Sequence, residues 1–357
     1  MADVHIVGAG PAGTISAISA IRHNHNVIIS EDHSVPGLPE NCSGLFSVDG
    51  LNSLKNFVDH KKAVINKIYG ANIHINGTVL QIRRPNPIAY VCNRSNIDFM
   101  LAKNAESEGA KINYGEKVTG DFHTENIIGA DGPFSYVARH FNFPKIKKFV
   151  ATLQTDVNFA CADIGIVEIY LSNKLFPGFF AWVVPHHEEK AEFGVGVEVP
   201  MRAVDGWKNL LKLKKIENAP KPSGAIIPIE TRPKTALKKN GKNILLVGDA
   251  AGQVKSTTGG GVIFGGNCAA LAGKFITDPH RYEVEWRLRF GPDLTMHKFI
   301  HDYLASRSDS SLSALGKQLK TMNIDSYLSK NGHMDKPTKM IQPAIVLHLL
   351  KNFVGAV

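Results

Sequence analysis

Residues 4–21 read VHIVGAGPAGTISAISAI, and this stretch decides the fold. A mostly apolar run leads into Gly8, Gly10 and Gly13 and then into an Ala-rich run, which predicts a strand, a tight turn and a helix. Gly8 permits the turn, Gly10 lets the backbone approach a pyrophosphate, and Gly13 lets the helix lie near the strand. The helix N-terminus offers free N–H groups to phosphates. A further strand at residues 26–30 ends in Glu31, about where an acid binds a ribose hydroxyl.

Two later segments narrow the choice of dinucleotide. They read IIGADGPFSYVAR at residues 127–139 and ILLVGDAAGQVKSTTGGG at residues 244–261. Together with the first motif, they resemble the FAD-dependent oxidoreductases of the aromatic-hydroxylase type. The resemblance implies a bound FAD, with Asp249 at the ribityl chain and glycines 259 to 261 beside the isoalloxazine. The alternative for Asp249 alone is a helix cap.

An arginine begins the next expected helix, in the sequence NRSNID at residues 93–98. The same flavoprotein group has an Arg at the start of a corresponding helix, placed against the FAD. The resemblance therefore implies that Arg94 contacts the cofactor. A solvated Arg at a helix start is the alternative.

Two more segments resemble the geranylgeranyl reductase family, which saturates isoprenoid double bonds of archaeal ether lipids and related prenyl chains. They are PENCSGL at residues 39–45 and FFAWVVP at residues 179–185, the latter ahead of a Gly-Val-Gly strand at residues 194–196. In that family the CxG segment lies close to the flavin and the aromatic segment lines an apolar substrate tunnel. Ser256 departs from the family, since many relatives have Pro there.

These resemblances imply the site residues. The cofactor set is Gly8, Gly10, Ala12, Gly13, Glu31, Cys42, Ser43, Gly44, Arg94, Asp131, Gly132, Gly248, Asp249, Gly259, Gly260, Gly261 and Val262. The substrate set is Phe176, Phe179, Phe180, Trp182 and Pro185, and the catalytic candidates are Cys42 and Trp182.

The chemistry of alkene reduction assigns a role to Cys42. Reduced flavin delivers a hydride, but an isolated prenyl alkene has no electron-withdrawing group to accept it. The protein must therefore supply a dry apolar slot and one acidic group. A thiol in apolar surroundings stays protonated, so Cys42 is the expected proton donor or relay. A buried, inert cysteine is the alternative.

Three classes of function remain open. The first is an FAD-dependent reductase of geranylgeranyl chains, on archaeal-type ether phospholipids. The second is an FAD-dependent monooxygenase acting on an apolar substrate, and the third is a non-catalytic FAD-bound lipid carrier. Ferredoxin, a deazaflavin and a reduced nicotinamide are all compatible electron donors.

Composition restricts the partners. The chain has 357 residues, 43% of them hydrophobic and 20% charged, which excludes a largely disordered protein. A net charge of +9 is compatible with anionic lipid or nucleic acid, but no basic run has interleaved aromatics. We therefore expect a prenyl lipid partner and no nucleic acid.

Cysteine usage and hydropathy indicate the cellular compartment of the protein. The four cysteines have no CxxC spacing, and the sequence shows no signal peptide. No apolar run reaches the roughly 18 residues of a spanning helix. These features predict a cytoplasmic protein with peripheral contact at the inner membrane face. His186 and His187 have no ligand partners at useful spacing, so no metal site is expected.

The alternation of patterns predicts an α/β fold. A discontinuous Rossmann-type FAD-binding domain is expected at residues 1–66, 93–148 and 235–280. Residues 67–92 and 149–234 have strand character and predict an inserted antiparallel substrate sheet, with a hairpin at Asn76-Gly77. Residues 281–357 predict a C-terminal helical region whose apolar tail packs on the core or rests on a bilayer.

Overall fold

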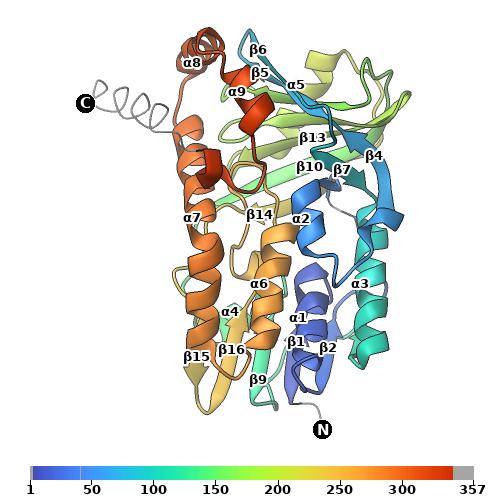
Figure 1. Ribbon diagram of the computed structural model, residues 1–357, viewed down its shortest axis with the longest axis vertical. Helices are drawn as coiled ribbons and strands as arrows, with labels where there is room; N and C mark the ends of the chain where they lie inside the picture. The colour runs from blue at the N-terminus through green and yellow to red at the C-terminus, as the bar shows by residue number, and fades with distance from the viewer. Residues whose placement is uncertain (1–2, 41, 341–357) are drawn as a thin grey trace, which may run out of the picture.

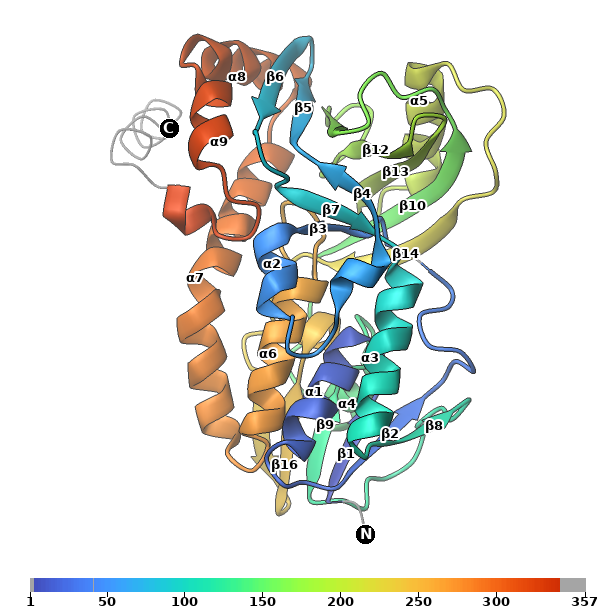
Figure 2. The same ribbon diagram turned by 45° about the vertical axis from the view of Figure 1, so that its right-hand side comes forward.

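A computed structural model describes residues 3–40 and 42–340 of the protein. Three β-sheets organise these residues. A six-stranded sheet lies toward the bottom of Figure 1 and a seven-stranded sheet toward the top. A three-stranded sheet lies between them, as the turned view of Figure 2 shows. The apolar tail at residues 341–357 lies outside the described residues.

The six-stranded sheet runs in the order β15-β16-β9-β1-β2-β8, and all its neighbours except β15 and β16 are parallel. Its strands are β1 (Val4–Val7), β2 (Val27–Glu31), β8 (Lys111–Tyr114), β9 (Asn126–Gly129), β15 (Ala236–Lys239) and β16 (Lys242–Leu246). The central strands β1 and β9 are buried almost throughout, as parallel strands covered on both faces are. This is the Rossmann-type sheet that the sequence predicts.

Helices cover both faces of this sheet. One face carries α1 (Pro11–Ile21), α3 (Arg94–Glu108), α6 (Val262–Lys274) and α7 (Pro279–Ala305) (Figure 1), and the other carries α4 (Tyr136–His140). Helices α1 and α6 pack backbone against backbone, since a Cβ at Gly273 would lie 2.4 Å from the carbonyl oxygen of Ser16. Ser19 also donates its hydroxyl to the carbonyl of Ala270 at 2.7 Å. The two helices are thereby held with their N-termini toward the same end of the sheet.

The seven-stranded sheet combines both predicted insertions, in the order β14-β10-β13-β12-β11-β5-β6. Its strands are β5 (Gly70–Ile75), β6 (Thr78–Arg83), β10 (Phe149–Asn158), β11 (Ile166–Leu171), β12 (Ala181–His187), β13 (Lys190–Glu198) and β14 (Ser223–Pro228). The predicted hairpin joins β5 to β6, and positive φ angles of 42° at Asn76 and 97° at Gly77 are those of a tight primed turn.

One pair in this sheet differs from the expected antiparallel arrangement. Strands β5 and β11 are parallel, with Gly70 opposite Ile166, while the other pairs are antiparallel. These two strands come from different insertions, so no short turn between them requires opposite directions. Helix α5 (Ala203–Lys214) packs on β13 and β10 and closes an apolar core there.

The remaining elements link these layers. The three-stranded sheet consists of β3 (Leu45–Ser47), β7 (Ala89–Cys92) and β4 (Val64–Ile68), and its strands are antiparallel. The other helices are α2 (Val48–Ser53), α8 (Asp309–Thr321) and α9 (Ile324–Asn331), with short 3₁₀ turns η1 (His60–Ala63), η2 (Gly248–Ala250) and η3 (Pro337–Met340). Helices α8 and α9 pack against the β5–β6 hairpin.

Two of the three sheets draw their strands from the ranges expected of the two domains, whereas the three-stranded sheet joins β3 from residues 1–66 to β7 from residues 67–92. All six strands of the first sheet come from residues 1–66, 93–148 and 235–280, and the seven-stranded sheet comes from residues 67–92 and 149–234. The domain boundaries themselves remain predictions. In the part of the chain that the structure describes, no helix has the length and apolarity needed to cross a membrane.

Candidate functional site

The first glycine motif forms a tight junction between two strands and a helix. Gly8 has a φ of +98°, and a Cβ there would lie 2.5 Å from the carbonyl oxygen of Ala130. A Cβ at Gly13 would lie 1.9 Å from the carbonyl oxygen of Gly8. Gly10 is different, because among the residues that the structure describes a Cβ there would meet nothing within 4 Å and no side chain caps α1. The first turn of α1 therefore has free N–H donors beside open space, as phosphate binding requires.

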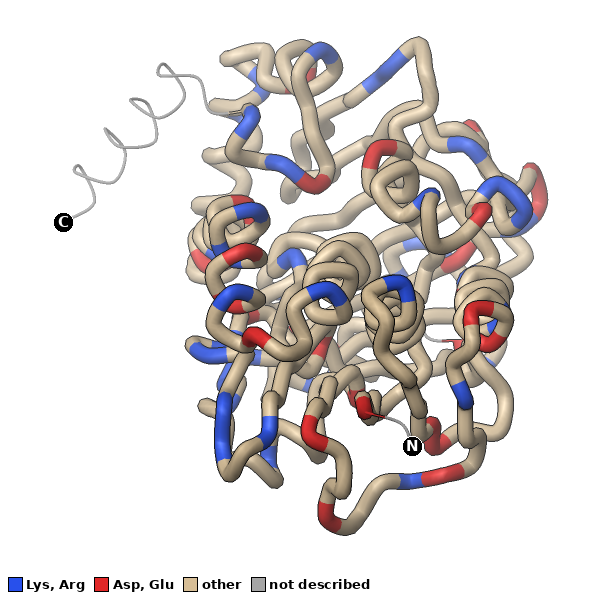
Figure 3. Tube along the Cα trace, turned by 60° about the horizontal axis from the view of Figure 1, so that its bottom comes forward, with Lys and Arg blue, Asp and Glu red and all other residues tan. Residues whose placement is uncertain are grey.

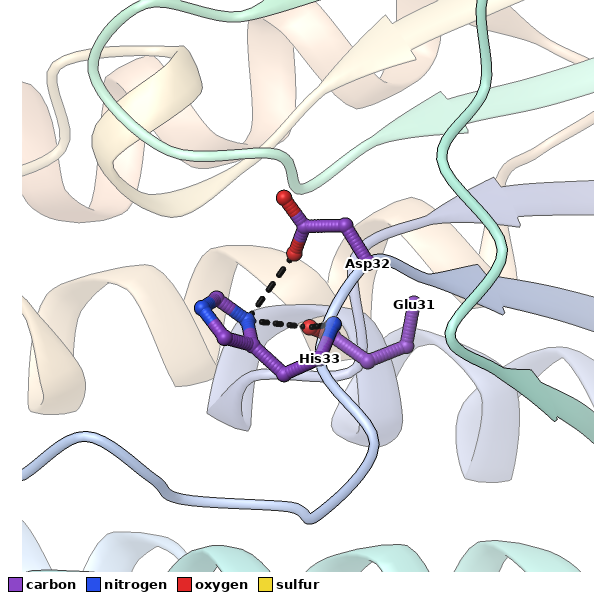
Figure 4. Close-up of side chains that lie close together, drawn as sticks. All are labelled: Glu31, Asp32 and His33. Carbon is purple, nitrogen blue, oxygen red and sulfur yellow. Dashed lines mark hydrogen bonds and ion pairs between the residues drawn. The ribbon is translucent and has the colours of Figure 1, made fainter.

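The acid expected at the ribose lies at the end of β2. One carboxylate oxygen of Glu31 accepts from the backbone N–H of Ala9 at 2.6 Å, and the other lies 2.7 Å from the His33 ring nitrogen. Asp32 approaches the same ring nitrogen at 2.9 Å (Figure 4). These three side chains form the one group among the described residues whose ligand atoms could gather around a metal ion. Their mutual contacts account for the arrangement without an ion, and the Glu31 carboxylate keeps lone pairs for a ribose hydroxyl.

The third motif brings Asp249 to the start of α6. Helix α6 begins after Gly261 without a side-chain cap, and a Cβ at Gly261 would lie 2.8 Å from Oδ1 of Asp249. A Cβ at Gly248 would lie 3.0 Å from the Ala12 side chain on α1. Burial raises the pKa of Asp249 to about 6, and its carboxyl has no hydrogen-bond partner among the described residues. Arg94 opposes this rise in pKa, and a half-buried carboxyl of this kind suits a ligand hydroxyl.

The second motif contains another incompletely paired acid. Oδ2 of Asp131 accepts from the N–H of Val137 at 3.0 Å, whereas its buried Oδ1 has no partner within the described part of the chain. A Cβ at the neighbouring Gly132 would meet nothing within 4 Å. Unpaired buried acceptors and uncapped helix N-termini fit a ligand with both hydroxyl and phosphate groups. FAD is such a ligand, and Gly10, Glu31, Asp131 and Asp249 are the residues that would hold it.

Cys42 and Arg94 lie next to each other. Two nitrogens of Arg94 pair with the two carboxylate oxygens of Asp98 at 2.6 and 2.9 Å, one helical turn along α3. Burial raises the pKa of the Cys42 thiol, although the Arg94 guanidinium opposes this. Gly44 packs on β7, because a Cβ there would lie 2.0 Å from the carbonyl oxygen of Cys92. The thiol is thus neutral and held beside a fixed cation.

Three aromatic rings form a continuous wall next to the third motif. The rings of Phe179 and Phe180 stack with centroids 4.3 Å apart, and Phe180 lies 5.6 Å from Trp182. Phe179 reaches to within 3.7 Å of the position that a Cβ of Gly259 would take. The wall therefore adjoins the glycines assigned to the isoalloxazine.

The Gly-Val-Gly strand explains how the wall packs. A Cβ at Gly194 would lie 2.0 Å from the indole ring of Trp182, and one at Gly196 would lie 2.3 Å from the ring of Phe179. Each ring occupies the space that a side chain on β13 would fill. The two glycines thereby support the aromatic wall.

Two of the predicted substrate residues lie elsewhere. Phe176 is fully buried in the core beneath α5, packed with residues such as Phe193 and Trp207. Pro185 is also buried, and strand alternation places it on the opposite face of β12 from Trp182. The structure therefore brings Phe179, Phe180 and Trp182 together but not Phe176 or Pro185.

Glu192 is a site residue that the sequence analysis did not identify. It lies two residues from Gly194 on the same face of β13, is only 6% exposed, and accepts from the Trp182 indole N–H at 2.9 Å. It lines a cavity of about 500 Å³ together with Cys42 and Ser43. Burial raises its pKa to about 8. The available signal was an acid, Glu192, next to the Gly-Val-Gly segment of the mostly apolar strand pattern AEFGVGVEV, which holds one further acid at Glu198.

A second cavity, of about 600 Å³, lies between α2, α6, α7 and the segment after α9. Apolar residues such as Ile263, Phe264 and Phe290 line it, together with the basic residues Lys336 and Lys339. It borders the third motif through Asp335, which lies at its wall and accepts from Lys255 Nζ at 2.7 Å. A Cβ at Gly260 would lie 2.6 Å from that lysine side chain.

Comparison with known proteins gives relatives along nearly the whole chain. No protein-family model matches. An uncharacterised protein of Methanocaldococcus jannaschii is 27% identical, covering 98% of this chain and 95% of the relative. The digeranylgeranylglycerophospholipid reductase of Methanosarcina acetivorans is 27% identical over 91% of this chain and 90% of its own. A Methanothermobacter thermautotrophicus protein with the same name is 26% identical over 98% of each chain.

Solved structures agree on the fold. A geranylgeranyl bacteriochlorophyll reductase-like protein from Thermoplasma acidophilum has a TM-score of 0.78 at 21% identity, covering 88% of this chain and 90% of its own. A probable FAD-dependent monooxygenase from Pseudomonas aeruginosa has a TM-score of 0.64 at 14% identity, covering 88% and 99%. The structures confirm the expected α/β fold class, and the relatives confirm the resemblance to geranylgeranyl reductases.

Proposed function

We propose, from the similarity of this chain to digeranylgeranylglycerophospholipid reductases, that the protein is an FAD-dependent reductase that saturates isoprenoid C=C bonds of geranylgeranyl chains. One observation carries the proposal. Phe179 of the aromatic wall lies beside Gly259, and Trp182 of the same wall donates to Glu192, which lines one cavity with Cys42.

The residues divide the work as follows. Reduced FAD supplies the hydride when it is bound. The aromatic wall excludes water from the alkene, and burial raises the pKa of the Cys42 thiol, which keeps it protonated until a carbon atom accepts the proton. The N-terminus of α6 favours negative charge next to it, and a hydride donor needs to be anionic.

The substrate is proposed to carry an anionic head group, as an archaeal-type ether phospholipid does. The cavity of about 600 Å³ supports this, because its apolar walls are bordered by Arg84, Lys336 and Lys339, and Asp49, Asp293 and Asp335 complete its charged lining. Long apolar chains suit such walls, and a phosphate suits lysine and arginine side chains. The proposed location is cytoplasmic, with peripheral contact at the inner membrane face. Figure 3 shows Lys and Arg distributed over many elements and interspersed with Asp and Glu, so a local basic cluster has to provide that contact.

The test is an anaerobic single turnover. The flavin is reduced with dithionite, a geranylgeranyl glycerophospholipid is added, and flavin absorbance is followed together with lipid mass. We expect a gain of two hydrogens per bond as the flavin reoxidises. No mass change, with a hydroxylated product only after oxygen enters, would identify the monooxygenase. Tight lipid binding without flavin reoxidation would identify a carrier. Ferredoxin, a deazaflavin and NAD(P)H are then compared as proposed electron donors.

Lys336→Ala/Lys339→Ala tests the anionic end of the substrate. We expect the double variant to raise the KM for the phospholipid about tenfold and to leave the KM for free geranylgeraniol unchanged, because only the phospholipid carries a phosphate. Lys317→Ala/Lys320→Ala on α8 removes the same charge outside this cavity and is the control. Equal effects of the two double variants would exclude a local phosphate contact.

A further inference from the structure

The wall of the cavity beside Cys42 contains an acid that alkene reduction can use. Strand β13 presents Glu192, Gly194 and Gly196 on one face, and the neighbouring β12 presents Trp182 on that face. The indole N–H donates to one carboxyl oxygen of Glu192 at 2.9 Å, so the orientation of that carboxyl is held. Cys42 lines the same cavity of about 500 Å³ and interacts electrostatically with Glu192.

The surroundings of Glu192 favour its protonated form. Buried at 6% exposure, it has no cation paired with it among the described residues, and Asp156 lies directly opposite on β10. Burial is the main cause that raises its pKa to about 8, and two nearby acids add to the shift. The other ionisable groups around the cavity are Glu40, Cys42, Cys92, Asp156, His186, His187, Lys190 and Lys221.

We propose that Glu192 is a proton-relay residue that returns a proton to Cys42 after each alkene reduction, an inference that rests on the proposed function. The thiol proton of Cys42 forms one new C–H bond with the alkene π pair. FAD, held by Gly10, Glu31, Asp131 and Asp249, would supply the hydride for the other bond, so that the alkene gains two electrons and the reduced cofactor gives them up. The Cys42 thiolate then takes the proton of Glu192, and Glu192 takes a proton from water in the cavity.

The direction of this transfer follows from the two acids. Burial raises the pKa of the thiol above its usual value of 9.0, whereas the Glu192 carboxyl lies at about 8. Proton transfer from Glu192 to the thiolate is therefore downhill. Glu192 gives the thiolate a proton donor whose orientation the Trp182 indole holds.

Glu192→Gln separates the relay from a structural role, because the amide oxygen still accepts from Trp182 but the side chain carries no titrating proton. We expect repeated turnover of the variant to slow about 100-fold, in the range of general acid–base effects. The wild-type rate falls above about pH 8 as Glu192 loses its proton, and the variant loses this inflection. Glu192→Asp, which restores a carboxyl, recovers part of the rate.

A measurement without turnover accompanies the kinetics. The infrared C=O stretch of a protonated carboxyl is followed from pH 6 to pH 10 in holoenzyme, and the wild-type minus Glu192→Gln difference should titrate near pH 8. Glu189→Gln, at the β12–β13 turn and outside this cavity, is the control for lost charge and keeps the wild-type rate.

The outcomes are distinguishable. Wild-type turnover with an unchanged rate and pH profile in Glu192→Gln overturns the relay and leaves the proposed function intact. Absence of the titrating infrared band overturns the relay as well. A wild-type protein that reduces no prenyl alkene overturns the proposed function and the relay together.

Discussion

At the scale of single residues, two glycines of β13 explain the shape of the candidate substrate wall. A Cβ at Gly194 would lie 2.0 Å from the indole of Trp182, which is closer than any packed atom tolerates. We expect Gly194→Ala to lower the free energy of unfolding by about 1–3 kcal/mol through overpacking. Urea unfolding measures this. Gly120→Ala is the control, since a Cβ there meets nothing within 4 Å and we expect a change within about 0.5 kcal/mol.

Glu192 makes stability depend on pH in a particular direction. Its folded-state pKa of about 8 is above the ordinary value of 4.5, so between these two values the folded protein binds a proton that the unfolded chain releases. The contribution of Glu192 to stability therefore falls as pH rises through this window. Thermal unfolding of wild type and Glu192→Gln from pH 5 to pH 9 should show a smaller loss of Tm in the variant. Parallel curves would contradict the raised pKa.

At the scale of elements, a substitution at the N-terminus of α1 tests cofactor binding without disturbing folding. Because a Cβ at Gly10 meets nothing within 4 Å, Gly10→Ala should fold with a Tm within about 2 °C of wild type when both are flavin-free. The same methyl group would occupy the approach of a pyrophosphate to the free N–H groups, so we expect FAD affinity to fall at least tenfold. Quenching of FAD fluorescence measures the affinity. Unchanged affinity would move the pyrophosphate away from α1.

Asp249 lies at the uncapped N-terminus of α6, and a substitution there tests that helix as Gly10→Ala tests α1. Its raised pKa, about 6, shows that burial already disfavours the charge. We expect Asp249→Asn to keep the fold but to lose copurifying flavin, because an amide cannot replace both carboxylate acceptors. Retained yellow colour would contradict the assignment of Asp249 to the ribityl chain. Asp131→Asn is the comparison, and we expect it to lose less flavin, because one oxygen of Asp131 already accepts a hydrogen bond from the N–H of Val137.

At the scale of the whole molecule, the proposed flavin site draws on residues from Gly8 to Gly261, so its ligand would link distant parts of the chain. We expect removal of FAD to lower the free energy of unfolding by about 2.7 kcal/mol when the cofactor had been present at 100 times its Kd. Calorimetry of flavin-free and reconstituted protein measures this difference. An unchanged unfolding temperature would place FAD outside the folded core.

The sequence predicts well those parts of the fold that short segments determine. The glycine motifs, the parallel strands and the Asn76-Gly77 turn depend on local geometry, which short segments encode. The parallel β5–β11 pair could not be predicted, because it joins strands almost a hundred residues apart. Phe176 shows why site residues are harder to predict. Aromatic residues close together in the sequence point in different directions where the chain passes from a loop into a strand. Glu192 was missed because its role depends on Trp182, with which no local pattern pairs it.

The order of the strands also has a consequence for synthesis on the ribosome. Strand β9 lies between β1 and β16, so its second edge stays unpaired until residues 242–246 have been translated. A nascent chain that has already formed β1, β2 and β9 therefore presents an open strand edge for the time it takes to add more than a hundred residues. Such edges recruit other strands. Chaperone demand during translation should be highest in this interval and should end once the tunnel releases β16.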